Sequence, residues 1–188
     1  MLEYKFTYLL GNLLLAPIWF YLFIHRKDLR HKIVILSLLF GLVGLISNFW
    51  YVKDYWEPIT IMGTRFGIED FIFGFFIGGI GSVFYEELFA KKFSKRHIRK
   101  HNFALFFVSL VGCGIIISNI SFLHFNLNSI YSSLIAFLIV GLGYFLFRKD
   151  LIFDAIMNGI LCGFILILAY GILLFFYPLL FQAFWKLD

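Results

Sequence analysis

Six long apolar runs, separated by short polar segments, dominate the chain. They cover residues 6–24, 33–51, 66–90, 103–122, 131–147 and 151–177. A helix needs about 20 apolar residues to cross the hydrocarbon core of a bilayer, and each run is close to that length. The pattern therefore predicts an all-α integral membrane protein with six transmembrane helices in one membrane domain, 1–188. Because the sixth run continues apolar to Trp185, Pro178 is expected to end or kink its helix.

Composition and charge refine this prediction. Hydrophobic residues make up 62% of the chain and charged residues only 14%, which excludes an ordinary soluble domain. Segments 25–32, 91–101 and 148–149 carry twelve lysines and arginines, and the alternate segments carry four. Basic loops mark the cytoplasmic side, so both termini are predicted to lie outside the cytoplasm, with the chain in the cell membrane. The net charge of +5 is then an orientation signal, and no nucleic-acid partner is predicted.

The two halves of the chain, 1–90 and 103–188, resemble each other faintly. The segment FGIEDFIFGFFIGGI can be laid over DLIFDAIMNGILCGF without gaps, which pairs Asp70 with Asp154. With three spans in each half, the halves would be inverted repeats, a common arrangement in membrane proteins. This alignment predicts two inverted three-helix repeats.

Two pairs of glycines have the spacing of close helix packing. Gly74 and Gly78 lie four residues apart in the third run, as do Gly159 and Gly163 in the sixth. Small residues at this spacing let helices approach closely inside a membrane. The third and sixth helices are therefore predicted to be central to the bundle.

Adjacent carboxylates, Glu69 and Asp70, stand at the start of the third run. Charges inside a bilayer are costly, so such a pair is a candidate catalytic site. Adjacent helical residues point about 100° apart, and the two side chains cannot face the same point. A desolvated carboxyl can stay protonated and act as an acid. In the alternative interpretation both residues are interfacial and are stabilised by the positive end of the helix and by Arg65.

Aromatic and polar residues extend this candidate site. Aromatic faces stabilise cations and bind apolar substrates, although an interfacial aromatic belt is the simpler explanation. Asp154 and Asn158, one turn apart in the sixth run, are a further candidate pair, with helix N-terminal charge as the alternative. The candidate substrate-binding residues are Trp50, Tyr55, Trp56, Phe66, Phe73 and Asn158, and Asp154 joins Glu69 and Asp70 as a candidate catalytic residue.

Other chemistry finds little support. The single H-x-x-x-H pattern, His97 and His101, is too few imidazoles for a di-iron site. There is no aspartate-rich magnesium motif and no glycine-rich phosphate loop, so no metal and no cofactor are predicted. Glu86 and Glu87, about 25 Å along the helix from the first pair, are predicted to form interfacial ion pairs.

The segment YWEPITIMGTRFGIEDFIFGF resembles the signature of the lycopene cyclase domain family, a group of integral-membrane carotenoid cyclases. In that signature a Tyr/Trp-rich loop and a glycine precede P-x-E-(E/D)-x-x-F at the start of a span. Gly67 stands where the motif usually has proline, and Phe153 stands where the second half should have a glutamate. The matching residues are Tyr55, Trp56, Pro58, Gly63, Glu69, Asp70 and Phe73.

The resemblance implies a redox-neutral reaction on lycopene or a related isoprenoid dissolved in membrane lipid. A carboxylic acid protonates the terminal double bond, the cation closes a six-membered ring, and loss of a proton gives a β-ionone end. Glu69 would be the acid or proton relay and Asp70 its partner. The chain is expected to form a homo- or hetero-oligomer. Two alternatives stay open: a non-catalytic protein that binds a carotenoid or quinone, and a small transporter that couples ions through Glu69, Asp70 and Asp154.

Overall fold

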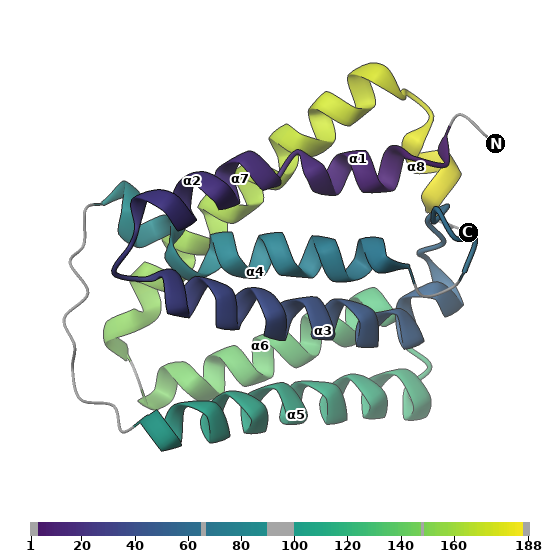
Figure 1. Ribbon diagram of the computed structural model, residues 1–188. Coiled ribbons are helices and arrows are strands. Elements are labelled where there is room, and N and C mark those ends of the chain that lie inside the picture. Colours follow the sequence, from purple (N-terminus) through teal and green to yellow (C-terminus); the bar gives the residue numbers. More distant parts are fainter. Residues whose placement is uncertain (1–3, 65–66, 90–99, 148, 186–188) are drawn as a thin grey trace. The chain divides into compact units, whose positions relative to one another are not determined.

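The computed structural model describes residues 4–64, 67–89, 100–147 and 149–185, with the side chains of 100–108 and 147 excepted. Within these residues the regular secondary structure is helical (Figure 1), as predicted. The chain divides into two compact units, Met1–Lys91 with Asp154–Asp188, and Lys92–Phe153. We call them unit 1 and unit 2. The predicted division into inverted repeats stays a prediction.

Unit 1 contains six helices whose ends follow from prolines and polar segments. The first predicted span is broken between α1 and α2, because Pro17 has no N–H to continue the helix. Pro178 ends α7 at Phe176, as predicted, since the residue before a proline avoids helical geometry. The helices are α1 (Thr7–Leu13), α2 (Ala16–His25), α3 (Arg30–Asp54), α4 (Ile68–Leu88), α7 (Ile152–Phe176) and α8 (Leu180–Phe184).

Helices α3 and α4 lie side by side (Figure 1) and pack through glycines. A Cβ atom on Gly74 would collide with the backbone carbonyl of Phe40, and one on Gly44 would collide with the carbonyl oxygen of Asp70. A Cβ on Gly78 would meet the side chain of Phe40. The predicted close approach at Gly74 and Gly78 is confirmed, and it brings the two backbones into contact.

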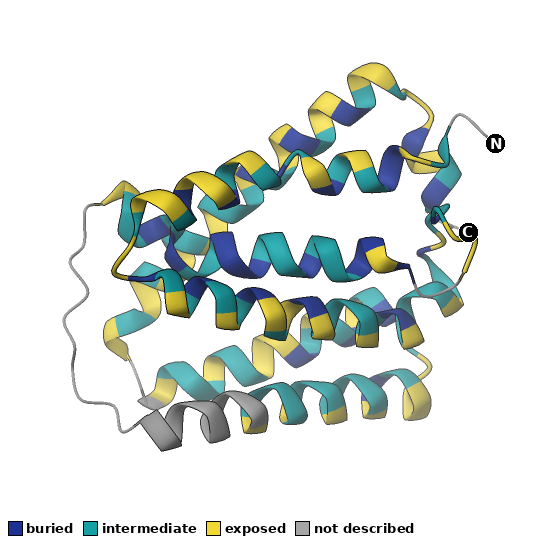
Figure 2. Cartoon of the chain, viewed as in Figure 1, coloured by how far each residue is buried: buried dark blue, intermediate teal, exposed yellow. Residues whose placement is uncertain are grey.

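The same prediction fails for α7. No described atom lies within 4 Å of where a Cβ on Gly159 or Gly163 would stand. Buried positions are frequent along α4, whereas α7 shows many exposed ones (Figure 2). Most of the exposed side chains on α7 are apolar, among them Phe164, Ile167 and Phe175. Helix α4 is therefore the central helix of unit 1, and α7 presents an apolar outer surface.

The core of unit 1 is sealed by a tryptophan from α2. Trp19 is almost fully buried, and its indole N–H donates to the hydroxyl of Ser37 on α3 at 2.8 Å. A Cβ on Gly79 of α4 would collide with both of these groups. The same core contains Leu15, Leu22, Ile33, Ile80 and Val83, together with Leu29, Ile165 and Ala169. A buried indole N–H requires a partner, and Ser37 supplies it at the crossing of three helices.

Unit 2 is a helical hairpin of α5 (Lys100–His124) and α6 (Ser129–Phe147), followed by the short 3₁₀ helix η2 (Lys149–Leu151). Asn126 adopts a positive φ of 48° in the turn, a conformation that asparagine tolerates. The Asn128 side-chain oxygen accepts from the N–H of Ile130 at 2.9 Å and caps the start of α6. Buried Ser121, Ser129 and Ser132 line the hairpin near this turn.

Five described helical segments are long and apolar enough to cross a membrane: Thr7–His25, Arg30–Asp54, Ile68–Leu88, Ser129–Leu146 and Lys149–Phe176. The described part of α5 with known side-chain placement, Ser109–His124, is apolar but shorter. Length and composition thus identify a membrane protein. Five of the six predicted spans are present by these criteria.

Ion pairs gather at the C-terminal end of α4. Glu86 pairs with Lys32 at 2.8 Å, and Glu87 pairs with His25 at 2.7 Å and with Arg26 at 3.5 Å. The guanidinium of Arg26 also binds Asp28, which holds the pKa of that carboxyl below its usual value. The prediction of ion pairs for Glu86 and Glu87 is confirmed, with partners from the end of α2, the turn after it and the start of α3. Lys91 and Lys92, which the sequence also places near them, lie outside the described residues.

Candidate functional site

A pocket of about 170 Å³ opens beside the N-terminal end of α4. We call it the aromatic pocket. Its walls come from α1, α3, α4, α7 and the segment after α8, all within unit 1. Asp70 is the only carboxylate among its lining residues. The lining residues are Tyr8, Gly44, Ser47, Asn48, Tyr51, Tyr55, Trp56, Asp70, Phe73, Tyr170 and Trp185.

Asp70 is buried, with 4% of its surface exposed, and it accepts three hydrogen bonds. The Tyr8 hydroxyl donates to Oδ1 at 2.6 Å, the Asn48 amide donates to Oδ2, and the backbone N–H of Gly67 donates to Oδ2 at 3.0 Å. Both oxygens therefore have donors, which would stabilise the carboxylate once a proton has left, whereas burial favours the protonated acid. The Gly67 bond also closes the first turn of α4, so Asp70 caps its own helix.

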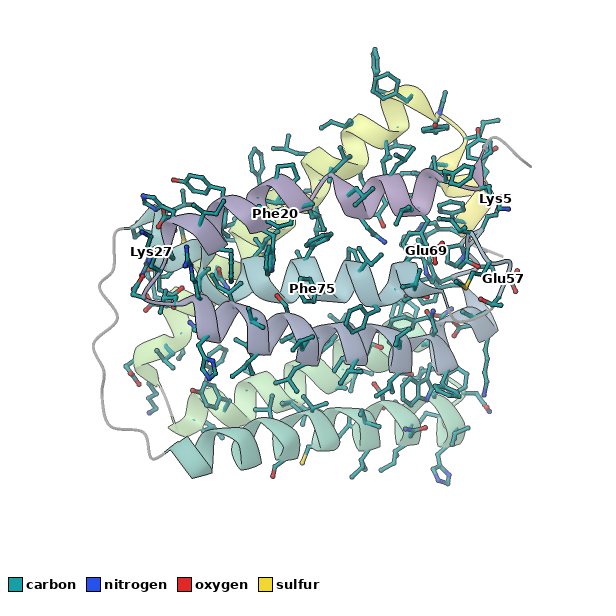
Figure 3. The ribbon with its side chains drawn as sticks, in the orientation of Figure 1. Lys5, Phe20, Lys27, Glu57, Glu69 and Phe75 are labelled. Carbon is teal, nitrogen blue, oxygen red and sulfur yellow. The ribbon has the colours of Figure 1, made fainter. Side chains whose placement is uncertain are left out.

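Glu69 points elsewhere, as the 100° separation predicts. It is fully buried; its Oε1 accepts from the N–H of Ile61 at 2.6 Å, and its Oε2 has no partner among the described residues. A charged carboxylate with a bare oxygen in an apolar site is costly, so this environment suits a neutral acid. Figure 3 shows Glu69 at the end of unit 1 where Lys5 and Glu57 also lie, with Lys27 at the other end.

No described lysine, arginine or histidine pairs with either carboxyl. Arg65, the cation that the interfacial interpretation invokes, lies outside the described residues. The two adjacent carboxyls thus have opposite environments, one rich in donors and one nearly without them. Divergent environments of this kind are how active sites assign different acid–base roles to paired carboxyls.

The segment before α4 folds back over Glu69. Gly63 adopts a φ of 63° and its N–H bonds to the carbonyl of Thr60 at 3.1 Å, which makes a tight turn. The buried Thr60 hydroxyl donates to the carbonyl of Thr64 at 2.8 Å. A Cβ on Gly67 would collide with Glu69 Oε2 and the Thr60 side chain. The turn therefore screens Glu69 from the surface.

Aromatic residues near residue 185 form part of the pocket wall, next to aromatic residues that follow α3. Trp56 and Trp185 form an isolated backbone bridge with ring centroids 5.6 Å apart, and the N–H of Glu57 donates to the carbonyl of Phe184 at 2.9 Å. The Tyr8 ring contacts Trp56 edge-on at 5.6 Å. The segment that follows α7 is thus fastened to the segment that follows α3, and α1 lies against both.

The structure brings together Asp70, Tyr55, Trp56 and Phe73 of the predicted site, with Glu69 beside them. Trp50 is half-buried on α3 and does not line the aromatic pocket. Phe66 lies outside the described residues. Most of the site residues predicted around Glu69 and Asp70 thus lie close together.

Asp154 and Asn158 lie elsewhere. Asp154 accepts from the Tyr85 hydroxyl at 2.8 Å, and the Asn158 amide donates to the carbonyl of Gly81 at 2.7 Å. Tyr85 is fifteen residues beyond Asp70 on α4, or about 22 Å along the helix. The two residues therefore fasten α7 to the C-terminal half of α4 and do not reach the aromatic pocket.

Several residues of the pocket escaped the sequence analysis, among them Tyr8, Asn48, Tyr170 and Trp185. Asn48 is a polar residue inside an apolar run, and that pattern could have marked it. Asn12 has the same pattern, and its amide donates to the carbonyl of Glu69 at 2.7 Å. Tyr8 and Trp185 carry no such signal, because aromatic residues are frequent throughout the chain.

Gly67 offers a test of this geometry. Replacing it with proline, the residue usual in the family motif, removes the N–H that donates to Asp70 and places ring atoms against Thr60 and Glu69. We expect Gly67→Pro to destabilise the protein by about 1–3 kcal/mol, measured by thermal unfolding in detergent. Gly63→Ala, which meets no described atom within 4 Å but needs a positive φ, is the control for turn strain alone. An unchanged Gly67→Pro protein would contradict the described contacts.

A scan against protein-family models and searches of curated proteins and of solved structures found no match to this chain. The resemblance to lycopene cyclases therefore rests on the motif from Tyr55 to Phe73.

Proposed function

We propose that this chain is a membrane enzyme that cyclises the end of lycopene or a related isoprenoid by proton transfer from a buried carboxyl. The observation that carries the proposal is Asp70, a carboxyl on the wall of a pocket lined mainly by aromatic rings. The motif resemblance points to the same residues. In this proposal all six apolar runs span the membrane, and the pocket lies toward the extracytoplasmic side, where both termini are placed by the positive-inside pattern.

The volume of the pocket suits one end of such a substrate. An apolar cavity of about 150 Å³ takes up benzene, so a pocket of about 170 Å³ has room for one six-membered ring. The rest of a carotene would extend from the pocket along apolar surface and lipid. Ring closure at one end at a time follows from this size.

In the proposed reaction Asp70 gives a proton to the terminal double bond of the substrate. The tertiary cation so formed is attacked by the internal double bond, which closes the ring and moves the positive charge within it. Loss of a ring proton to the carboxylate restores Asp70, so no electrons are gained or lost. The donors Tyr8, Asn48 and Gly67 stabilise the carboxylate that forms during proton transfer.

Neighbouring groups would assist this step. The faces of Trp56 and Trp185 border the pocket and would stabilise the cation. Glu69, whose environment suits the neutral acid, would act as a proton reservoir for its neighbour. Burial of both carboxyls limits the access of water that would quench the cation.

A second candidate is binding of a carotenoid or other isoprenoid without catalysis. One observation favours it: Asp154, the second-half carboxylate, bonds to Tyr85 and does not join the pocket. A single chain then holds one acidic motif, and a partner chain would have to supply another if the reaction needs two. The exposed apolar side chains of α7 could contact such a partner or lipid.

Expression in a bacterial host that accumulates lycopene tests the proposal. We expect extracted pigments to shift from lycopene toward γ- or β-carotene, to lose this shift in Glu69→Gln, and to keep it in Glu86→Gln, whose carboxylate pairs with Lys32 at the far end of α4. Chromatography of the pigments gives the result. Unchanged lycopene beside well-expressed protein would refute cyclisation of this substrate, and equal loss in both variants at normal protein level would refute the site.

A further inference from the structure

The aromatic pocket carries more hydrogen-bonding groups than a hydrocarbon ligand can use. Tyr8 and Asn48 bind Asp70, and the Ser47 hydroxyl donates to the carbonyl of Gly44 at 2.7 Å. Tyr55 and Tyr170 also line the pocket, and neither hydroxyl has a hydrogen-bond partner among the described residues. Both tyrosines are half-buried, and a tyrosine hydroxyl that a ligand covers usually finds a partner. Two donors thus remain for whatever occupies the pocket.

Tyr55 and Tyr170 line the same pocket. Burial raises the pKa of Tyr55 above its ordinary value, and the neighbouring Tyr51, Asp54 and Tyr170 raise it further. The Tyr55 hydroxyl therefore stays protonated at neutral pH and is available as a donor. Its ring is held between Tyr51 at 5.4 Å and Trp185 at 5.5 Å.

Tyr170 is also held in place by an aromatic neighbour. It extends from α7, and its ring stacks on Phe181 of α8 with centroids 6.2 Å apart and an interplanar angle of 11°. Each tyrosine ring is thus fixed by aromatic neighbours, so its hydroxyl is preorganised and loses little side-chain entropy when a ligand binds.

We propose that the ligand of the aromatic pocket is an isoprenoid whose terminal unit carries an oxygen atom, a hydroxyl or a carbonyl, that accepts hydrogen bonds from Tyr55 and Tyr170. The inference rests on the proposed function only in placing an isoprenoid end in this pocket. An oxygenated polyene and the ring of an isoprenoid quinone share this chemistry, and both fit a pocket with room for one six-membered ring.

The expected preference is moderate. A net hydrogen bond contributes about fivefold to affinity, and pockets built to bond an oxygen discriminate against ligands that lack it, because their donors are then left unpaired. We therefore expect an oxygenated isoprenoid to bind at least about fivefold more tightly than the hydrocarbon of the same skeleton.

Binding to the whole protein in lipid nanodiscs tests this inference. The probes are lycopene, 1-hydroxylycopene and a ubiquinone with a short isoprenoid tail, followed by quenching of tryptophan fluorescence, since Trp56 and Trp185 line the pocket. We expect Tyr170→Phe to reduce the preference for the oxygenated probe about fivefold. Tyr177→Phe makes the same change just beyond the end of α7, at a residue that does not line the pocket, and should leave the preference intact.

The outcomes distinguish an oxygenated polyene from a quinone as the ligand, and they distinguish this inference from the proposed function. Tighter binding of 1-hydroxylycopene or of the quinone identifies the source of the oxygen. Equal affinity for all three probes, no binding of any probe, or an unchanged preference in Tyr170→Phe overturns the inference. Cyclisation of lycopene without a preference for oxygen would leave the proposed function standing, whereas a preference without cyclisation would remove it.

Discussion

Asp70→Asn is expected to lower the rate of cyclisation at least 100-fold. A positioned general acid contributes about 10²- to 10⁴-fold, and the amide cannot give a proton to a double bond. Asparagine keeps the size of the side chain and an oxygen that can accept from Tyr8 or Gly67, so the fold should persist. The measurement is conversion of lycopene by membranes that contain equal amounts of each protein.

Asp154→Asn is the matched control for this variant. It makes the same chemical change on a side chain that also accepts from a tyrosine hydroxyl, that of Tyr85. Because Asp154 lies near the opposite end of α4, its replacement should change the rate by no more than a few-fold. A reversed result, with Asp154→Asn inactive and Asp70→Asn active, would place the chemistry at the C-terminal half of α4 and refute the assignment to Asp70.

Gly74→Ala is expected to lower the free energy of unfolding by at least about 2 kcal/mol. The added methyl group would stand on the carbonyl of Phe40, and a clash with backbone cannot be relieved by turning a side chain. The closely packed pair α3 and α4 would have to separate. The effect opposes the ordinary gain of up to about 1 kcal/mol when alanine replaces glycine inside a helix.

Gly159→Ala supplies the opposite sign. No described atom lies within 4 Å of its Cβ position, so alanine should stabilise α7 by about 0.5–1 kcal/mol. Thermal unfolding of both purified variants in the same detergent compares them directly. If both variants shift stability in the same direction, the packing described for Gly74 is wrong.

The extent of the helices was predictable because the signals for it are local. The third and sixth runs, 66–90 and 151–177, agree with α4 and α7 to within two residues at each end. Polar residues bound the first and Pro178 ends the second. The first run was expected to be one helix, although Pro17 within it already marks a break.

The site was only half predictable, because its partners come from distant parts of the chain. Glu69, Asp70 and the aromatic residues before them stand within one motif. Tyr8 reaches Asp70 across 62 positions of sequence and Asn48 across 22. No local pattern states which distant aromatic residue meets a carboxyl. Packing through Gly44 and Gly74 decides which faces of α3 and α4 meet.

The bridge between Trp56 and Trp185 bears on how the protein is made. A ribosome synthesises Trp185 about 180 residues after Tyr8, yet both residues border one pocket. A nascent chain that has already inserted α1, α3 and α4 still lacks the wall formed by Tyr170 and Trp185. Asp70 therefore remains without its finished surroundings until residues 170–185 have left the ribosome and α7 has entered the bilayer. The aromatic pocket is consequently completed only late in biosynthesis.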